Sequence, residues 1–232
     1  MTRAETIAAN LAEVRARLVA AELAAGRTAG SVRLVAVSKK MTADDVRAAL
    51  SAGQRIFGES YGQELRDKRA LLAGDLQPPE WHFIGPLQSN KVKYVAGQVA
   101  LVHAVDSAPL LEAIEARGVP QACLIQVNVA GEAQKRGVAP AELPALLDRF
   151  AALRFTHCQG LMLIPPLGRG PQEARPHFAA LRDLRDREAG RARPRVDLRE
   201  LSMGMSGDFE LAVAEGATLV RIGSAIFGDR ST

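Results

Sequence analysis

Short apolar runs alternate with longer amphipathic segments along this chain, and this alternation restricts its possible folds more than any other feature. The first run, VRLVAV at 32–37, is continuously apolar and rich in β-branched residues, which is typical of a strand buried on both faces. A helix over 4–25 precedes it, because Leu11, Val14 and Leu18 recur at helical spacing. Later strands are expected over 54–57, 81–84, 100–104, 122–129, 155–163, 198–202 and 218–222. Helices are expected over 42–50, 60–73, 88–95, 107–117, 140–152, 172–189 and 207–215.

Eight such strand-helix units average about 29 residues each, and their alternation predicts a parallel sheet covered by helices. Eight units favour a closed (β/α)8 barrel, and an open, doubly wound sheet is the alternative. The text after the first strand, VSKKMTADD, lacks the GxGxxG turn of dinucleotide-binding folds, which favours the barrel. The composition is 47% hydrophobic and 24% charged, and no long linker interrupts it. We therefore predict one α/β domain over 1–232, a single TIM barrel with an extra N-terminal helix.

Charge and cysteine usage argue against several classes of partner. The net charge is +4, but the arginines between Arg182 and Arg199 are interspersed with acids and lack neighbouring aromatic residues, so no nucleic-acid partner is expected. The first residues resemble no signal peptide and no apolar run is long enough to cross a membrane, so we expect a cytoplasmic protein without a membrane partner. Cys123 and Cys158 form no CxxC pair and the histidines lack ligand spacing, so neither disulfides nor a metal are expected.

The chemistry of a (β/α)8 barrel collects at the carboxyl ends of its strands, and the first strand ends in a lysine. Val35, Val37 and Lys39 alternate along one face, so we expect Lys39 to point with the two valines toward the barrel axis. Desolvation lowers the pKa of such an amine and makes it nucleophilic toward aldehydes. The alternative is a lysine that extends from the strand end to solvent. Lys40 points the other way and is expected at the surface.

Two segments near the C-terminus carry glycine and serine where a strand leads into a helix: SMGMSGD at 202–208 and RIGSAIFG at 221–228. Free backbone N–H groups at such positions bind phosphate, and the loops after the last two strands of a TIM barrel are frequent phosphate sites. The alternative is that the glycines only permit tight turns and that Ser206 caps a helix. Asp208 and Glu210 oppose an anion there.

Arg221 ends the last strand on a buried run, and a buried guanidinium needs an acceptor. A pyridine nitrogen or a carboxylate would serve, and an internal salt bridge with Asp106 or Glu59 is the alternative. A lysine, an arginine and a phosphate cradle at one barrel mouth indicate a phosphorylated aldehyde such as pyridoxal 5′-phosphate.

These motifs together resemble the pyridoxal phosphate homeostasis protein family over about residues 4–228. The segments that carry the resemblance are LVAVSKK, FGESYGQE, WHFIGPLQSNK, HAVDS, VNVAGEAQKRGV, GLMLIP and LSMGMSGDFELAVAEGATLVRIGSAIFG. The resemblance implies a barrel like the N-terminal domain of alanine racemase, with pyridoxal phosphate held as a Schiff base on Lys39. It implies a phosphate bound by Ser206, Gly223 and Ser224, and Arg221 facing the pyridine nitrogen. Asn128 and Met162 would line the ring pocket.

The chain departs from the family pattern at a few positions. Ser60 stands where the family usually has asparagine, Gly207 stands where aspartate is common, and the VNVAGEAQKRG segment lacks two usual serines. The intact HFIG and LQSNK segments leave the role of His82, Gln88, Asn90 and Lys91 open between a ligand-handling surface and a structural cap on the third strand.

The resemblance implies a non-catalytic carrier that buffers pyridoxal phosphate and delivers it to apo-enzymes that depend on this cofactor. The alternative is a fold-type III enzyme, a racemase or decarboxylase acting on amino acids. A two-base racemase needs a group on each face of the cofactor, and enzymes with this barrel obtain the second from an appended domain. Thr232 lies ten residues beyond Ile222, so we expect no such domain and favour a monomeric carrier.

Overall fold

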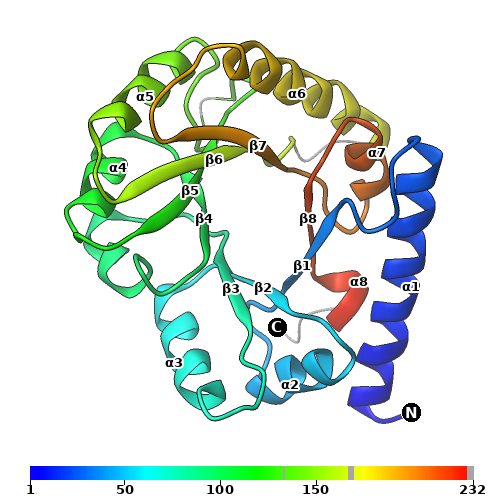
Figure 1. Cartoon of the computed structure of the whole chain (residues 1–232). Helices are drawn as coiled ribbons and strands as arrows, with labels where there is room; N and C mark the ends of the chain where they lie inside the picture. Colours follow the sequence, from blue (N-terminus) through cyan, green and yellow to red (C-terminus); the bar gives the residue numbers. More distant parts are fainter. Residues whose placement is uncertain (133, 167–169, 229–232) are drawn as a thin grey trace.

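Eight parallel strands close into a barrel in the computed structural model, which describes residues 1–132, 134–166 and 170–228 (Figure 1). Each strand pairs with the next along the chain, and β8 pairs with β1 to close the ring. The prediction of a closed (β/α)8 barrel is therefore confirmed, and the open sheet is wrong. The strands are β1 (Arg33–Val37), β2 (Ile56–Glu59), β3 (Glu80–Phe83), β4 (Leu101–Val105), β5 (Gln121–Gln126), β6 (Thr156–Met162), β7 (Val196–Ser202) and β8 (Leu219–Ile222).

Helices surround the strands on the outside of the ring (Figure 1). The predicted helix at the front is α1, which packs against α2, α7 and α8. Within the described residues, no helix combines the length and the apolar character needed to cross a membrane. The α-helices are α1 (Arg3–Ala24), α2 (Ala43–Ser51), α3 (Gly62–Leu72), α4 (Ala108–Glu115), α5 (Leu143–Arg149), α6 (Arg175–Ala189), α7 (Phe209–Ala214) and α8 (Ser224–Phe227). The 3-10 helices are η1 (Ser89–Tyr94), η2 (Phe150–Ala152) and η3 (Pro171–Ala174).

Two of the helices start with reciprocal capping boxes. The Thr2 hydroxyl accepts the Glu5 N–H, and the Glu5 carboxylate accepts the Thr2 N–H. Thr42 and Asp45 make the same pair of bonds at the start of α2, which confirms Thr42 as its N-cap. Each box satisfies two backbone N–H groups that the first helical turn leaves without partners, and so fixes where the helix begins.

Two segments differ from their predicted structure. The helix expected over 88–95 is the 3-10 helix η1, in which only Val92 is buried, so little apolar packing favours a regular α-helix there. The strand expected over 122–129 ends at Gln126. The chain beyond it turns back, because Val138 N–H donates to the Gln126 carbonyl and Asn128 N–H donates to the Val138 carbonyl.

The core has two parts because side chains alternate along each strand. Outward-facing residues such as Leu34, Ala36 and Ile125 pack under the helices in a large apolar shell. A separate, smaller apolar cluster fills the ring itself and consists of Val35, Leu101, Ala104, Ala122, Leu124, Met162 and Leu219. Several polar side chains are buried in the strands beside this cluster: His82, His103, Ser202 and Arg221.

The contact between β6 and β7 depends on a glycine. Gly160 has φ +154°, and a Cβ built on it would lie 1.9 Å from the Glu200 carbonyl oxygen. The register between these two strands shifts at this point, between Cys158 and Gly160. Any larger residue would push the two strands apart, so glycine is required for this part of the ring to close.

Candidate functional site

Five of the residues singled out from the sequence line one cavity at the carboxyl ends of the strands. The cavity has a volume of about 280 Å³. The five residues come from the loop after β1, the loop after β7 and the end of β8, and they are Lys39, Ser206, Arg221, Gly223 and Ser224. The remaining lining residues are Val37, Ser60, Ile84, Ile164, Met205 and Gly207. The structure thus brings a primary amine, a guanidinium and two hydroxyls to one concave site.

A tight turn places Lys39 at this cavity. Met41 N–H donates to the Ser38 carbonyl at 3.0 Å, and Lys40 takes a left-handed conformation with φ +64°. A non-glycine residue in this conformation is uncommon, and here it leaves Lys40 exposed while Lys39 is half-buried. Lys39 borders the cavity together with Val37, as the alternation along the first strand predicts.

A buried ion pair supports this turn from below. Lys68 Nζ donates to the Ser38 carbonyl at 2.6 Å, to Glu59 Oε1 at 2.8 Å and to Glu64 Oε1 at 2.7 Å. The Ser38 hydroxyl also donates to Glu59 Oε1, at 2.7 Å. Burial raises the pKa of Glu59, although Lys68 opposes that effect, and Glu59 Oε2 has no hydrogen-bond partner among the described residues.

The two serines meet at another part of the cavity lining. Ser224 Oγ lies 3.2 Å from Ser206 Oγ, and Ala225 N–H points to Ser206 Oγ at 3.5 Å. Ser206 is not the N-cap of α7, because that helix begins at Phe209 with Asp208 as its N-cap residue. The predicted helix start after the last strand is α8. Both hydroxyls are therefore placed to serve a ligand in the cavity.

The acids that argued against an anion here are directed to other partners. Asp208 Oδ1 accepts the Met205 N–H at 2.6 Å. Burial raises the pKa of Asp208, and the attraction of Arg221 lowers it in part. Glu210 forms an ion pair with Arg17 of α1 at 2.6 Å. Neither carboxylate lines the cavity among the described residues, which removes the objection to a phosphate.

Arg221 carries a positive charge inside the barrel. It is 5% exposed, its Nη1 donates to Ser202 Oγ at 2.6 Å, and its Nη2 donates to the Leu163 carbonyl at 2.9 Å. Burial lowers the pKa of Arg221 to about 10, which still leaves it protonated at neutral pH. Within the described ranges it forms no ion pair with a carboxylate.

The internal salt bridge considered for Arg221 is therefore wrong. Asp106 pairs with Arg136 at 3.0 Å, and Glu59 pairs with Lys68. Both acids are thus already neutralised by other cations. Asp208 attracts Arg221 without an ion pair between them, and a buried guanidinium without a direct carboxylate partner beside a cavity favours a ligand that carries an acceptor.

The other two predicted residues lie next to the cavity rather than on its wall. Asn128 borders an adjoining cavity, and its Nδ2 donates to the Glu132 carbonyl at 2.8 Å. Met162 is completely buried in the apolar cluster inside the ring. The two cavities share Ile84 and Ile164, which form an apolar wall between them.

The sequence analysis did not single out Ile84 and Ile164. Ile84 directly follows β3 and Ile164 lies two residues after the end of β6, so the rule that identified Lys39 could have found them. They were missed because only polar strand ends were considered. Ser60, which stands where the family usually has asparagine, also lines the cavity. The side-chain amide that this chain lacks would therefore lie at the site itself.

Residues of the types that bind metal ions also occur outside this cavity, and the structure assigns them no reactive role. No group of three or more such side chains in the described residues could hold a metal ion. Cys123 and Cys158 are register partners on β5 and β6, although they are distant in sequence. Both are free and buried, and burial raises the pKa of each thiol, to about 12 for Cys158. Thiols of this kind are inert.

The sequence matches the family described as "Alanine racemase, N-terminal domain" over residues 4–231. A protein of Pseudomonas aeruginosa named Pyridoxal phosphate homeostasis protein is 48% identical, with 97% of this chain and 96% of that protein covered. A protein of the same name from Aquifex aeolicus is 42% identical, with 95% and 96% covered.

Solved structures give the same grouping. PipY of Synechococcus elongatus without PLP superposes with a TM-score of 0.84 at 39% identity, covering 96% of this chain and 100% of that one. PipY with PLP bound gives a TM-score of 0.82 at 38% identity. Alanine racemase of Corynebacterium glutamicum has 17% identity and a TM-score of 0.70 over 62% of its length, and so shares the fold. This chain therefore belongs to the pyridoxal phosphate homeostasis protein family, which is built on the alanine racemase N-terminal domain.

Proposed function

We propose that this protein binds pyridoxal 5′-phosphate at the carboxyl ends of its strands and acts in vitamin B6 homeostasis, holding the cofactor and delivering it. The observation that carries this proposal is that one cavity collects a lysine amine, a buried guanidinium and two serine hydroxyls: Lys39, Arg221, Ser206 and Ser224. The names of the relatives and the PLP-bound form of PipY support it.

The donor set of the cavity fits this cofactor. When bound, pyridoxal phosphate supplies an aldehyde that reacts with primary amines, together with a ring nitrogen and a phosphate. Lys39 Nζ would form the covalent attachment. The hydroxyls of Ser206 and Ser224 would bind the phosphate, with backbone N–H groups at Gly223 and Ser224. The buried charge of Arg221 has no carboxylate partner among the described residues, which leaves it able to meet an acceptor on the ligand.

Arg221 would control the protonation of the pyridine ring of the cofactor. Because Arg221 stays protonated at neutral pH, its guanidinium would donate to the ring nitrogen and keep that nitrogen free of a proton. A ring nitrogen without its proton withdraws electrons less strongly, which suits storage of the cofactor more than turnover. Asn128 and Met162 remain predicted neighbours of the ring.

We propose a carrier rather than an enzyme, acting as a monomer in the cytoplasm and serving apo-enzymes that use the cofactor, with no role in nucleic-acid binding. The relatives that align with nearly the whole of this chain carry the homeostasis name. The likeness to alanine racemase and to lysine/ornithine decarboxylase, at 17% and 15% identity, concerns the fold. A racemase or decarboxylase acting on amino acids is the second candidate.

The attachment is tested by adding pyridoxal phosphate to the purified protein and reducing the product with borohydride. We expect a visible absorption band that borohydride removes, and a mass increase confined to the peptide that contains Lys39. Lys39→Ala should abolish both. Lys40→Asn is the matched control, since it removes the neighbouring exposed amine and asparagine tolerates the left-handed backbone. A band that survives Lys39→Ala, or an adduct on another peptide, would contradict the assignment.

The choice between carrier and enzyme is tested separately. The loaded protein is incubated with the L and D forms of alanine, serine and lysine, and optical inversion and CO₂ release are followed. We expect neither to exceed the rate given by free pyridoxal phosphate. Sustained turnover that depends on Lys39 would replace the carrier with the enzyme, and transfer of cofactor to an added apo-enzyme would support the carrier directly.

A further inference from the structure

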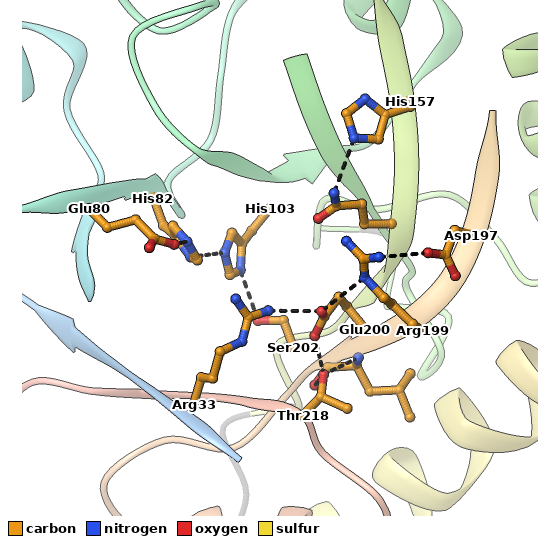
Figure 2. Close-up of polar contacts among 12 residues, drawn as sticks. Arg33, Glu80, His82, His103, His157, Asp197, Arg199, Glu200, Ser202 and Thr218 are labelled. Atoms are coloured by element: carbon orange, nitrogen blue, oxygen red, sulfur yellow. Dashed lines mark hydrogen bonds and ion pairs between the residues drawn. The ribbon is translucent and has the colours of Figure 1, made fainter. Parts of the chain in front are cut away.

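A chain of polar side chains runs across the inside of the barrel from Arg221, and Figure 2 shows its part from Ser202 to Glu80. Ser202 Oγ, which accepts from Arg221, lies 2.9 Å from His103 Nδ1. His103 Nε2 lies 2.9 Å from His82 Nδ1, and His82 Nε2 lies 3.0 Å from Glu80 Oε1. The residues come from β8, β7, β4 and β3, so the chain connects opposite sides of the ring. We call these five residues the relay.

The two ends of the relay fix the direction of every hydrogen bond in it. A guanidinium only donates, and an ionised carboxylate only accepts. Glu80 therefore requires a proton on His82 Nε2, and a neutral His82 then accepts at Nδ1. His103 must consequently carry its proton on Nε2 and accept at Nδ1 from the Ser202 hydroxyl. Each of the other four members donates once toward Glu80, which leaves no buried nitrogen of the two rings unsatisfied.

The relay joins the cofactor cavity to the opposite mouth of the barrel. Arg221 lines the cavity, and Ser202 and His103 are completely buried. Glu80 is the first residue of β3, at the end of the barrel away from Lys39, and its side chain is 44% exposed. We propose that Ser202 and His103 are positioning residues for Arg221, and that the relay couples this arginine to the charge on Glu80 and His82 at the far mouth.

Protonation would reverse the direction of the hydrogen bonds between the two histidines and Ser202. If the relay takes up one proton from solvent, His82 holds a proton on both nitrogens and donates from Nδ1 to His103 Nε2. His103 then carries its proton on Nδ1 and donates to Ser202 Oγ. Ser202 would accept from both His103 and Arg221, and its own hydroxyl proton would have to turn away. The setting of Arg221 would thus differ between the two forms.

Charged side chains on several strands influence the balance between the neutral and the protonated relay. Burial lowers the pKa of His82, Glu80 and Glu200 oppose that, and Arg33 adds to it. Burial also lowers the pKa of His103 well below its ordinary value, with contributions from His82, Arg221 and Arg33. Arg33 pairs with Glu200 at 2.8 Å beside the relay (Figure 2). The neutral relay is therefore the form at neutral pH, and acid conditions reverse it.

The first test uses the ligand-free protein and does not depend on the proposed function. Nitrogen-15 NMR of the histidine rings at about pH 8 should show a proton on Nε2 of both His82 and His103. Glu80→Gln should lower the pKa of His82, because it removes an attracting charge. Arg221→Gln should raise the pKa of His103, because it removes a repelling one. His157, outside the relay, is the internal control.

The second test rests on the proposed function and asks whether the two ends are coupled. The dissociation constant of pyridoxal phosphate is measured from about pH 5 to 8.5 for the wild type, Glu80→Gln, Ser202→Ala and the double variant. Glu80→Gln should shift the midpoint of the profile to lower pH, changing affinity about fivefold or more near pH 6, and Ser202→Ala should remove that shift. Lys39 and the cofactor are the same in all four proteins, so the comparison isolates the relay. Asp197→Asn, an exposed charge at the same mouth, is the control and should leave the profile unchanged.

Each outcome decides a separate point. A proton on His103 Nδ1 at pH 8 overturns the direction of the relay. A Glu80→Gln shift that is equal with and without Ser202→Ala overturns the coupling. If Arg221→Gln does not fold, Glu80→Gln decides the first test, since its side chain is partly exposed. If pyridoxal phosphate does not bind, the proposed function fails while the ring protonation still tests the relay.

Discussion

Replacing Lys68 by methionine should destabilise the fold and disturb the turn that presents Lys39. Lys68 and Glu59 have side chains that are 6% and 0% exposed, and their charged atoms lie 2.8 Å apart. At an effective dielectric constant of 20, that attraction is about 6 kcal/mol at 2.8 Å. Part of this lost attraction is offset in Lys68→Met, because the variant has no ammonium group to desolvate on folding. Removing one partner of such a pair typically costs about 3–5 kcal/mol, a large share of the about 5–15 kcal/mol that holds a domain folded.

The loss of stability caused by Lys68→Met should depend on pH, and the direction of that dependence follows from the pKa of Glu59. Burial raises its pKa above the ordinary value of 4.5, and loss of Lys68 would raise it further, since Lys68 lowers it. A carboxyl whose pKa is raised in the folded state penalises folding above that pKa and not below 4.5. The destabilisation by Lys68→Met should therefore be largest near pH 8 and should shrink toward pH 5, because the raised pKa of Glu59 favours its protonated form as the pH falls.

Urea unfolding at both pH values measures this effect. The double variant Glu59→Gln with Lys68→Met removes both charges of the buried pair, leaves only the more exposed Glu64 without Lys68, and should recover at least half of the loss at pH 8. Lys93→Met, which removes an exposed lysine, is the control and should stay within about 0.5 kcal/mol of the wild type. A Lys68→Met cost below about 1 kcal/mol, or one that is equal at both pH values, would refute this account of the pair.

Three further outcomes are expected. Burial lowers the pKa of His103, so the free energy of unfolding should be highest above the ordinary pKa of 6.5 and should fall as the pH drops below it, by up to about 1.4 kcal/mol per pH unit. His103→Gln should flatten that slope in urea unfolding. An unchanged slope would exclude this histidine as its source. Gly160→Ala should cost about 2–4 kcal/mol in thermal unfolding, because its Cβ meets the Glu200 carbonyl; a neutral change would mean that β6 and β7 separate easily. Ser206→Ala and Ser224→Ala should each weaken pyridoxal phosphate binding about tenfold or more in an absorbance titration, and an unchanged affinity would contradict the phosphate assignment.

The barrel was predictable because strands such as β1, β4 and β5 are short, mostly apolar runs that alternate with amphipathic helices, which is a local property. The segment over 88–95 was not, since little of η1 is buried and nothing in its own sequence selects an α-helix over a 3-10 helix. The end of β5 at Gln126 depends on hydrogen bonds to Val138, which the strand pattern does not include.

The cavity was predictable for a related reason: polar residues that end parallel strands must meet at one mouth of the barrel. Contacts across the ring were not predictable, because they depend on which side chains face each other from distant strands. The acceptors of Arg221 are Ser202 and the Leu163 carbonyl, not the acids considered from the sequence. His82 could only be left between two roles, since its partner His103 lies on another strand.

The closure of the ring by β1 and β8 has a consequence for how the protein is made. The lysine of the cavity lies early in the chain, whereas Ser206, Arg221 and Ser224 lie far later and so leave the ribosome after it. Asn10 of α1 even donates to the Ile226 carbonyl of α8, at 2.9 Å. A nascent chain that lacks β8 thus has the amine without the rest of the pocket, and it gains a complete binding site only when its two ends have come together.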